Sequence, residues 1–412
     1  MKLASKRTLT CVLISSFIFT LLTNATVASA DANSRNGAVI ENGVIFPIVE
    51  KLPLGQIVTT PCNVEIVHNG KNLIHEADIV IDPGHGGRES GSVGSNGLVE
   101  RDLNLTVAFL VEEELKSMGY SVFLTRRSDL HMPIRQRTDI AKSLAPKAFV
   151  SIHHNGGAVV SSSHPGTETF HQNGSPESKR LAGLLYEEIS NAFSEYWVPW
   201  VATAHRGASS RLSEPGRDAY GILRYTPAVP SVIIEAAYLS NPPEAELLAI
   251  PEVQKAEAVA IAVAINRFIT TSDPGSGFKP SFIDGLMTGT GSGRGCVDPK
   301  YATSTRVTVG YKKEEFDSLI SAAKKARMSI EEFQIFGVHA LDLFLKLDSS
   351  EDDKEINEVN EPEIAGSNVS VVEWSAESQV ALARVGAKYD MTASQVQKLG
   401  ATLMVFLTSL AD

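Results

Sequence analysis

Two histidines and two glutamates in this chain have the chemistry expected of a metal-dependent site. His85 lies in the segment Asp-Pro-Gly-His-Gly-Gly and His153 in Ser-Ile-His-His-Asn, and the carboxylates are Glu100 and Glu235. Two imidazoles and one carboxylate can hold a catalytic Zn²⁺ and leave one position for water. A further carboxylate beside the metal can act as a general base. These four residues therefore predict metal-assisted hydrolysis.

The elements that must position these residues alternate between strands and helices. Strands are expected at residues 77–81, 120–125, 148–152, 166–171, 220–224 and 231–235, and helices at 103–118, 134–144, 176–193 and 251–269. This alternation predicts an α/β fold with an open, mostly parallel sheet and helices on both faces. Ligands of such sheets bind beyond the carboxyl ends of the strands, where His85, His153 and Glu235 would meet.

The first 30 of the 412 residues have the composition of a signal peptide. Lys2, Lys6 and Arg7 precede an apolar stretch, and Ala-Ser-Ala at 28–30 is a cleavage signal. The alternative is a membrane anchor, but the apolar stretch is short for a span and ends in small residues. We expect an exported chain with no transmembrane segment, in the periplasm of a Gram-negative cell or otherwise secreted or associated with the cell wall.

The charge and cysteine content of the exported chain restrict its partners. Loss of three cations and no anions moves the formal net charge from −11 to −14, which argues against nucleic-acid binding because that depends on neutralising phosphates. Cys62 and Cys296 remain and could pair in an oxidising compartment.

Composition also divides the chain into segments. We expect a signal peptide at 1–30, a small β extension at 31–76, the catalytic domain at 77–270, a Gly/Ser/Pro-rich linker at 271–305, a strand-helix-helix repeat at 306–347, an acidic linker at 348–367 and a second repeat at 368–412.

The two C-terminal repeats carry matching residues. The spacing from Met328 to Gly337 equals that from Met391 to Gly400, and a capping box follows each of these methionines. Each copy resembles a ribbon-helix-helix unit, a family in which two chains pair their strands and pack four helices beneath them. Two copies in one chain could form that assembly intramolecularly, as a structural or protein-contact module. An ordinary helical bundle is the alternative.

The order of motifs between residues 79 and 269 is more specific. Asp82 to Gly87, Glu100 with Asn-Leu at 104–105, Thr-Arg at 125–126 with Asp129, Ser-Ile-His at 151–153 with Asn155, and Val-Ile-Ile-Glu at 232–235 followed by Leu-Ser-Asn occur in that order. In the order of these motifs, the segment resembles the zinc-dependent N-acetylmuramoyl-L-alanine amidases of the third amidase family. The resemblance implies that His85, Glu100 and His153 hold one Zn²⁺ and that Glu235 is the catalytic carboxylate.

Other residues near these motifs have several interpretations. Asn155 could contact substrate or fix a ligand, and Glu168 could shape the substrate groove. Arg126, Asp129 and Arg137 match family positions, and either a structural role or substrate contact is open to them. His154 should point to the opposite face of its strand. Four further histidines are expected to be bystanders: His131, His164, His171 and His205.

The resemblance implies a peptidoglycan hydrolase that cleaves the amide bond between N-acetylmuramic acid and L-alanine. A protein activator is a further expected partner. Between His153 and Glu235 the sequence shows no second apolar helix of the kind that blocks the zinc site in some relatives. Two alternatives stay open: a zinc peptidase that acts on stem peptides, and an inactive cell-wall-binding scaffold.

Overall fold

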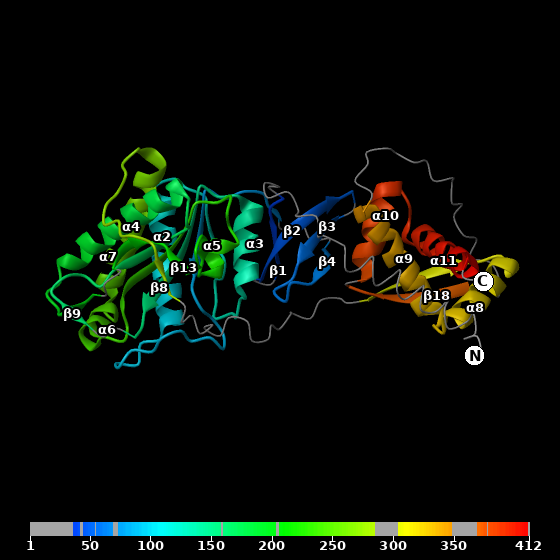
Figure 1. Ribbon diagram of the computed structural model, residues 1–412, viewed down its shortest axis with the longest axis horizontal. Helices are drawn as coiled ribbons and strands as arrows, with labels where there is room; N and C mark the ends of the chain where they lie inside the picture. Colours follow the sequence, from blue (N-terminus) through cyan, green and yellow to red (C-terminus); the bar gives the residue numbers. More distant parts are fainter. Residues whose placement is uncertain are drawn as a thin grey trace, which may run out of the picture.

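A computed structural model describes most of the chain (Figure 1). The described residues are 36–41, 44–53, 55–68, 73–157, 160–202, 206–284, 304–347, 369–376 and 378–410. The expected signal peptide, the acidic linker at 348–367, most of the linker at 271–305, His205 and Cys296 lie outside these residues. Within them, no helix is both long and apolar enough to cross a membrane.

A six-stranded sheet forms the centre of the largest part of the chain. Its order is β12 (Gly207–Ser209), β10 (Glu168–His171), β15 (Ser231–Tyr238), β8 (Ala148–Asn155), β6 (Ile79–Pro83) and β7 (Val122–Leu124). All neighbouring pairs are parallel except β10 and β15. β6, β8 and β15 carry apolar runs near their starts because helices bury both of their faces. The predicted open, mostly parallel sheet is confirmed.

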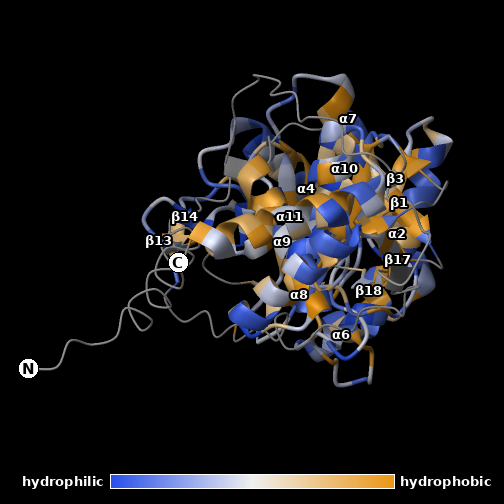
Figure 2. Cartoon of the chain, turned by 90° about the vertical axis from the view of Figure 1, so that its right-hand side faces the viewer, coloured by the Kyte–Doolittle hydropathy of each residue, from blue (hydrophilic) through white to orange (hydrophobic). Residues whose placement is uncertain are grey.

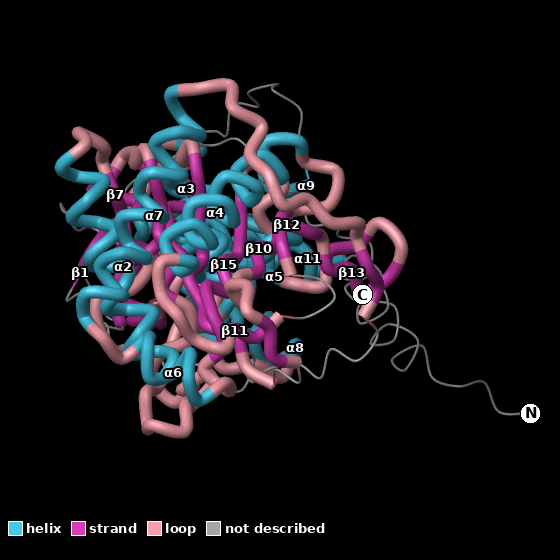
Figure 3. Tube along the Cα trace, turned by 90° about the vertical axis from the view of Figure 1, so that its left-hand side faces the viewer, coloured by secondary structure: helices cyan, strands magenta, loops and turns pink. Residues whose placement is uncertain are grey.

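Helices cover the two faces of this sheet unequally. On one face, α2 (Glu100–Ser117), α4 (Pro176–Ser194) and α7 (Pro251–Thr270) lie side by side and share one apolar core with the strands (Figure 3). On the other face, α3 (Ile134–Leu144) and the short α5 (Gly221–Arg224) pack in a second core. All four predicted helices are present, and α3 has the predicted bounds.

One predicted strand is wrong, and one helix was not predicted. Residues 220–224 form α5, a single turn that starts after Tyr220, and not a strand. A short apolar run such as Gly-Ile-Leu fits either element, so periodicity could not decide between them. The unpredicted helix is α6 (Pro242–Leu248), which Asn241 caps by accepting from the backbone N–H of Glu244.

Short strands complete this part of the chain. They are β9 (Ser161–Ser162), paired with β11 (Trp200–Val201), and β13 (Arg211–Glu214), which pairs with β14 (Arg217–Asp218) and with β16 (Phe282–Ile283).

Residues 38–74 form a separate antiparallel sheet, the β extension. Its strands are β1 (Ala38–Glu41), β2 (Val44–Leu52), β3 (Gly55–Thr59), β4 (Glu65–His68) and β5 (Leu73–Ile74), in the order β4-β3-β2-β1-β5. Ala38 and Ile45 belong to the core beneath α3, which fixes the extension to the α/β unit. Cys62 is disulfide-bonded.

The C-terminal module consists of two strand-helix-helix copies. The first is β17 (Ser304–Gly310), α8 (Lys313–Ala326) and α9 (Ile330–Leu347), and the second is β18 (Val369–Ser375), α10 (Ser378–Tyr389) and α11 (Ala393–Leu410). β17 pairs antiparallel with β18, and α9 packs against α11 (Figure 2). This is the intramolecular pairing expected of two ribbon-helix-helix copies, and kinship with that family stays a prediction.

The matching glycines of the two copies have a structural reason. A Cβ on Gly337 would overlap the carbonyl oxygen of Gly400, and a Cβ on Gly400 would lie 2.7 Å from the backbone nitrogen of Val338. The two helices therefore cross where neither carries a side chain.

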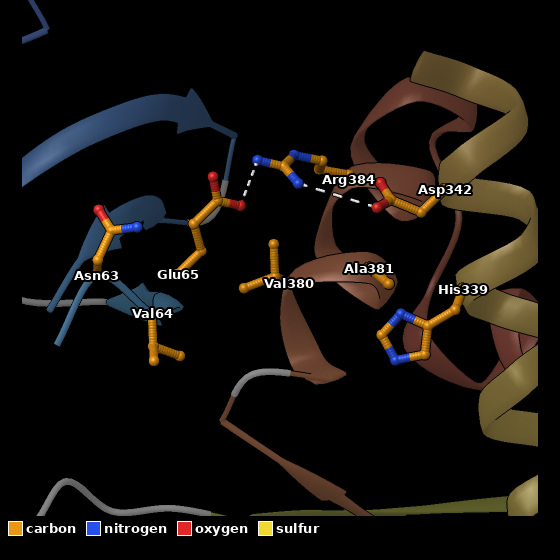
Figure 4. Close-up of a pocket in the computed structure, with 8 residues that line it drawn as sticks. All are labelled: Asn63, Val64, Glu65, His339, Asp342, Val380, Ala381 and Arg384. Carbon is orange, nitrogen blue, oxygen red and sulfur yellow. Dashed lines mark hydrogen bonds and ion pairs between the residues drawn. The ribbon is translucent and has the colours of Figure 1, made fainter. Parts of the chain in front are cut away.

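The β extension lies between the α/β unit and the C-terminal module (Figure 1). On its far side, Arg384 of α10 forms ion pairs with Glu50 at 2.7 Å and Glu65 at 2.8 Å. Asp342 of α9 lies 3.9 Å from the same guanidinium, at the edge of a cavity of about 330 Å³ (Figure 4).

Candidate metal centre

Strand register brings the predicted residues into one row across the central sheet. Glu168 of β10 lies opposite Glu235 of β15, which lies opposite His153 of β8. In-register neighbours point to the same face of a sheet, so these three side chains share one side. Pro83 at the end of β6 lies opposite Ile152, which places the His85 turn beside the row.

His85, Glu100 and His153 form the group of described residues that could hold a metal ion. Their candidate ligand atoms all lie within 4.8 Å of one another. Oε1 of Glu100 lies 3.1 Å from Nε2 of His85 and 3.0 Å from Nδ1 of His153. The two imidazole rings meet edge to face, with centroids 4.8 Å apart. Glu100 is the first residue of α2, so an element of the helical layer completes a site that begins on the sheet.

A strained turn presents His85. Its φ of +59° lies in the left-handed region, which is uncommon for a residue with a side chain. Arg137 donates to the carbonyl oxygen of His85 at 2.6 Å and forms an ion pair with Asp82 at 2.7 Å. Arg126 donates to the carbonyl oxygens of Pro83 and Gly84, each at 2.9 Å. Both arginines are buried and hold the turn, so their role is structural.

Asp129 holds the same turn from outside. Its Oδ1 accepts from the backbone N–H of Gly87 at 2.6 Å. Together, the side chains of Arg126, Asp129 and Arg137 bind the backbone of the His85 turn.

Two glycines make room for the candidate ligands. A Cβ on Gly84 would overlap the imidazole of His153. A Cβ on Gly91 would overlap Oε2 of Glu100 and lie 2.7 Å from Cδ2 of His85. The glycines therefore allow the backbone to approach three side chains closely.

The surroundings of the ligands keep the carboxylate charged. Burial alone raises the pKa of Glu100, but hydrogen bonds from His153 and His85 outweigh it and hold that pKa well below its usual range. The backbone N–H of Ser92 also donates to Oε2 of Glu100 at 2.7 Å. Burial lowers the pKa of His153 and so favours the neutral imidazole, the form that binds metals.

The pKa of Glu235 is shifted in the opposite direction to that of Glu100. Burial raises the pKa of its carboxyl well above the usual range, the negative charges of Glu100 and Glu168 add to this, and Arg211 opposes it. Its Oε2 is buried and has no hydrogen-bond partner among the described residues. A cation held by Glu100 would offset the repulsion between the carboxylates, so Glu235 could lose and regain a proton.

Asn155 and Glu168 form a pair at the edge of the row. Nδ2 of Asn155 donates to Oε2 of Glu168 at 2.8 Å, and the hydroxyl of Tyr238 donates to the same oxygen at 2.9 Å. Asn155 thus orients the carboxylate of Glu168. Glu168 lies opposite Glu235, and its role in a substrate groove stays a prediction.

His154 and the predicted bystander histidines that the structure describes lie outside the ligand group. His154 is buried on the other face of β8, as predicted. His171 is also buried, its Nδ1 3.0 Å from the hydroxyl oxygen of Ser210. His131 lies 3.9 Å from Glu89, and His164 contacts Ser162.

Three residues of the site region were missed from the sequence. Arg211 and Tyr220 interact electrostatically near Glu235, and Glu257 lies behind the centre. Arg211 begins the short strand β13, which was not predicted, and Tyr220 was assigned to a wrong strand. Glu257 is an acidic residue in an otherwise apolar stretch of α7, a signal that could have been used.

Comparisons with known proteins match the same part of the chain. Residues 79–267 match the family described as N-acetylmuramoyl-L-alanine amidase. The protein YqiI of Bacillus subtilis is 33% identical over 192 residues, which cover 46% of this chain and 84% of that protein. The germination-specific N-acetylmuramoyl-L-alanine amidase of the same species is 30% identical, covering 47% of this chain and 79% of that protein.

Longer relatives are matched only in part. AmiC of Neisseria meningitidis is 29% identical, over 47% of this chain and 53% of its own length, so the chain spans about half of that relative. Among solved structures, the catalytic domain of CwlV from Bacillus (Paenibacillus) polymyxa is 30% identical with a TM-score of 0.40, covering 47% of this chain and 98% of that domain.

The sequence matches cover the residues that build the row of carboxylates and imidazoles, and two of those relatives are matched over more than three quarters of their length. Because of these matches, the chain belongs to the N-acetylmuramoyl-L-alanine amidase family.

Proposed function

We propose that this protein is a zinc-dependent amidase that hydrolyses the bond between the lactyl group of N-acetylmuramic acid and L-alanine in peptidoglycan. The observation that carries the proposal is the convergence of His85, Glu100 and His153 beside Glu235, whose buried carboxylate oxygen has no partner among the described residues. A protein that only binds the cell wall would not need three ligands and a separate carboxylate.

The donor set fits zinc. Ligand atoms about 2.0 to 2.1 Å from a tetrahedral Zn²⁺ lie about 3.3 Å apart, and the two histidine nitrogens lie 3.1 and 3.0 Å from Oε1 of Glu100. His85, Glu100 and His153 would hold the ion with little rearrangement. When bound, Zn²⁺ supplies Lewis acidity that polarises the scissile carbonyl and makes the attacking water more acidic.

Glu235 moves the proton in this proposal. Its free carboxylate oxygen accepts a proton from water as the water oxygen bonds to the carbonyl carbon. The carbon–nitrogen bond then breaks, and the same carboxyl delivers that proton to the departing amine of L-alanine. Its raised pKa suits this role, because a more basic carboxylate takes the proton from water more readily.

The place of action is part of the proposal. Export to the periplasm or the cell exterior would bring the site to its polymer, and a protein activator stays a prediction. The zinc peptidase and the inactive scaffold are the two alternatives that the experiment must separate.

A digest of purified peptidoglycan tests the reaction. Mass spectrometry should show stem peptides with a free L-alanine amine and unsubstituted muramic acid, and a chelator should abolish both products. Cuts confined to the stem would favour the peptidase. Absence of any release, with zinc and candidate activators present, would favour the scaffold.

Two variants test the assigned roles. Glu235→Gln should bind zinc like the wild type and lose about 10²-fold or more in rate, because general-base catalysis contributes that much. His85→Ala should lose both zinc and activity. Normal cleavage by Glu235→Gln would refute the role given to Glu235.

A further inference from the structure

A fully buried histidine–carboxylate pair lies directly behind the candidate metal centre. His154 follows the ligand His153 on β8 but points to the opposite face, toward α7. Its Nε2 lies 3.2 Å from Oε2 of Glu257, and both side chains have an exposed fraction of 0%. Burying two ionisable groups is a weak source of stability compared with apolar residues of similar volume. The pair therefore calls for a reason other than stability.

Hydrogen bonds connect this pair to a candidate metal ligand. Nδ1 of His154 lies 2.8 Å from Oδ1 of Asn104, a residue that is itself buried on α2. Nδ2 of Asn104 donates to Oε1 of Glu100 at 3.5 Å and to the carbonyl oxygen of Gly84 at 3.3 Å. The contacts thus run from Glu257 through His154 and Asn104 to Glu100.

The direction of each hydrogen bond follows from the chemistry of the groups. Glu100 and the carbonyl of Gly84 can only accept, so the amide nitrogen of Asn104 must face them. The amide oxygen of Asn104 then faces His154, which must donate from Nδ1. Nε2 of His154 either donates to an ionised Glu257 or accepts from a protonated one. In the first case His154 is an imidazolium with a proton on both nitrogens, and in the second it is the neutral Nδ1–H tautomer. In both arrangements contact with Glu257 is compatible with the proton on Nδ1 that Asn104 requires.

We propose that Glu257 and His154 are positioning residues that orient the amide of Asn104 and thereby hold Glu100 in the geometry that binds the metal. The inference rests on the metal centre of the proposed function. Partners behind metal ligands commonly set ligand orientation, and their loss weakens metal affinity by about 10- to 100-fold. His154 also reaches Glu100 directly, because its backbone N–H lies 3.3 Å from Oε1.

Zinc affinity of the full chain, measured by competition with a chelator, tests the inference. Glu257→Leu should weaken zinc binding by about 10-fold or more. Glu257→Gln should stay within about threefold of the wild type, because its amide can donate to Nε2 and keep the proton on Nδ1. Val253→Ala is the matched control, since Val253 is a fully buried apolar residue of the same helix. It should lower the melting temperature and leave zinc affinity unchanged.

Three results would overturn the inference. The first is wild-type zinc affinity in Glu257→Leu, and the second is equal weakening in Val253→Ala at equal loss of stability. The third is a ¹⁵N spectrum of the metal-free wild type in which Nδ1 of His154 carries no proton. A chain that binds no zinc would remove the metal centre and this inference with it. A chain that binds zinc but leaves the amide intact would refute only the proposed reaction.

Discussion

At the scale of single residues, the candidate ligands are held by groups that cannot move far. His85 lies on a turn bound by two buried arginines, Glu100 accepts backbone and side-chain hydrogen bonds, and His153 lies within a central strand. Preorganisation of this kind lowers the cost of binding a metal, because few rotamers must be fixed when the ion arrives. The site should therefore be sensitive to small steric changes behind it.

Gly84→Ala tests this sensitivity. The new Cβ would overlap the imidazole of His153, which must then shift away from Glu100. We expect zinc affinity to fall by about 10-fold or more and stability by about 1 to 3 kcal/mol, the usual range for overpacking. Chelator competition and chemical denaturation measure the two effects.

Gly174→Ala is the control for this change. Gly174 follows β10 at the end of the sheet opposite the centre, and a Cβ there meets no atom within 4 Å. Its φ of +77° makes alanine unfavourable, so this variant should lose stability and keep its zinc affinity. Equal zinc affinity in Gly84→Ala and the wild type would contradict the steric argument.

The sequence was sufficient to name the candidate ligands but not the residues that support them. His85, Glu100, His153 and Glu235 could be named because each lies in a short motif whose residues are close in the chain. The contact between His154 and Glu257 joins positions 103 residues apart, and no local pattern encodes such a pairing. Long-range partners depend on how α7 packs on the sheet, which periodicity does not give.

At the scale of elements, the register of the central sheet determines which side chains lie next to one another in the site. Long helices such as α3 were predictable because several turns of apolar periodicity define them. The one-turn α5 was not, since its few residues fit either element. Single side chains also hold the segments next to β15 in place. Glu244 of α6 is the clearest case.

Glu244 joins two elements through its carboxylate. Oε2 accepts from the backbone N–H of Tyr238 at 2.5 Å, and Oε1 accepts from the backbone N–H of Val201. Burial raises the pKa of Glu244 to about 7 from 4.5, although these backbone hydrogen bonds lower it. The folded state therefore binds this proton more tightly than the unfolded state. The stability that comes from proton binding is present below about pH 4.5 and is lost as the pH rises to about 7.

Glu244→Gln should remove that pH dependence. In the wild type, the Glu244 contribution to the free energy of unfolding should fall by on the order of 2 to 3 kcal/mol between pH 4.5 and pH 7.5. Denaturation at several pH values should show a smaller fall in Glu244→Gln, whereas Glu252→Gln, at an exposed position of α7, should keep the wild-type slope. Identical slopes in all three proteins would refute the assignment to Glu244.

At the scale of the whole molecule, the β extension connects the α/β unit to the C-terminal module. One side of it shares a core with α3, and the other meets α10 of the C-terminal module (Figure 1). Apolar contact on the module side is small, with Ala376 packed at the edge of the extension's own core. The charged contacts of Arg384 should therefore contribute much of the attachment.

Arg384→Met tests whether these contacts hold the module in place. The Arg384 side chain is 13% exposed and faces Glu50, Glu65 and Asp342, so its loss leaves three carboxylates near one another. Figure 4 shows two of these carboxylates, Glu65 and Asp342, on either side of Arg384. We expect the attachment to weaken by about 1 kcal/mol, because Glu50 and Glu65 are 41% and 40% exposed and solvent screens their attraction to Arg384. Small-angle X-ray scattering should show a larger radius of gyration than for the wild type.

Lys324→Met removes one exposed positive charge from α8 and should leave the scattering curve unchanged. Zinc affinity should be equal in all three proteins, since the centre lies in the α/β unit. Unchanged scattering by Arg384→Met would show that apolar contacts alone hold the module.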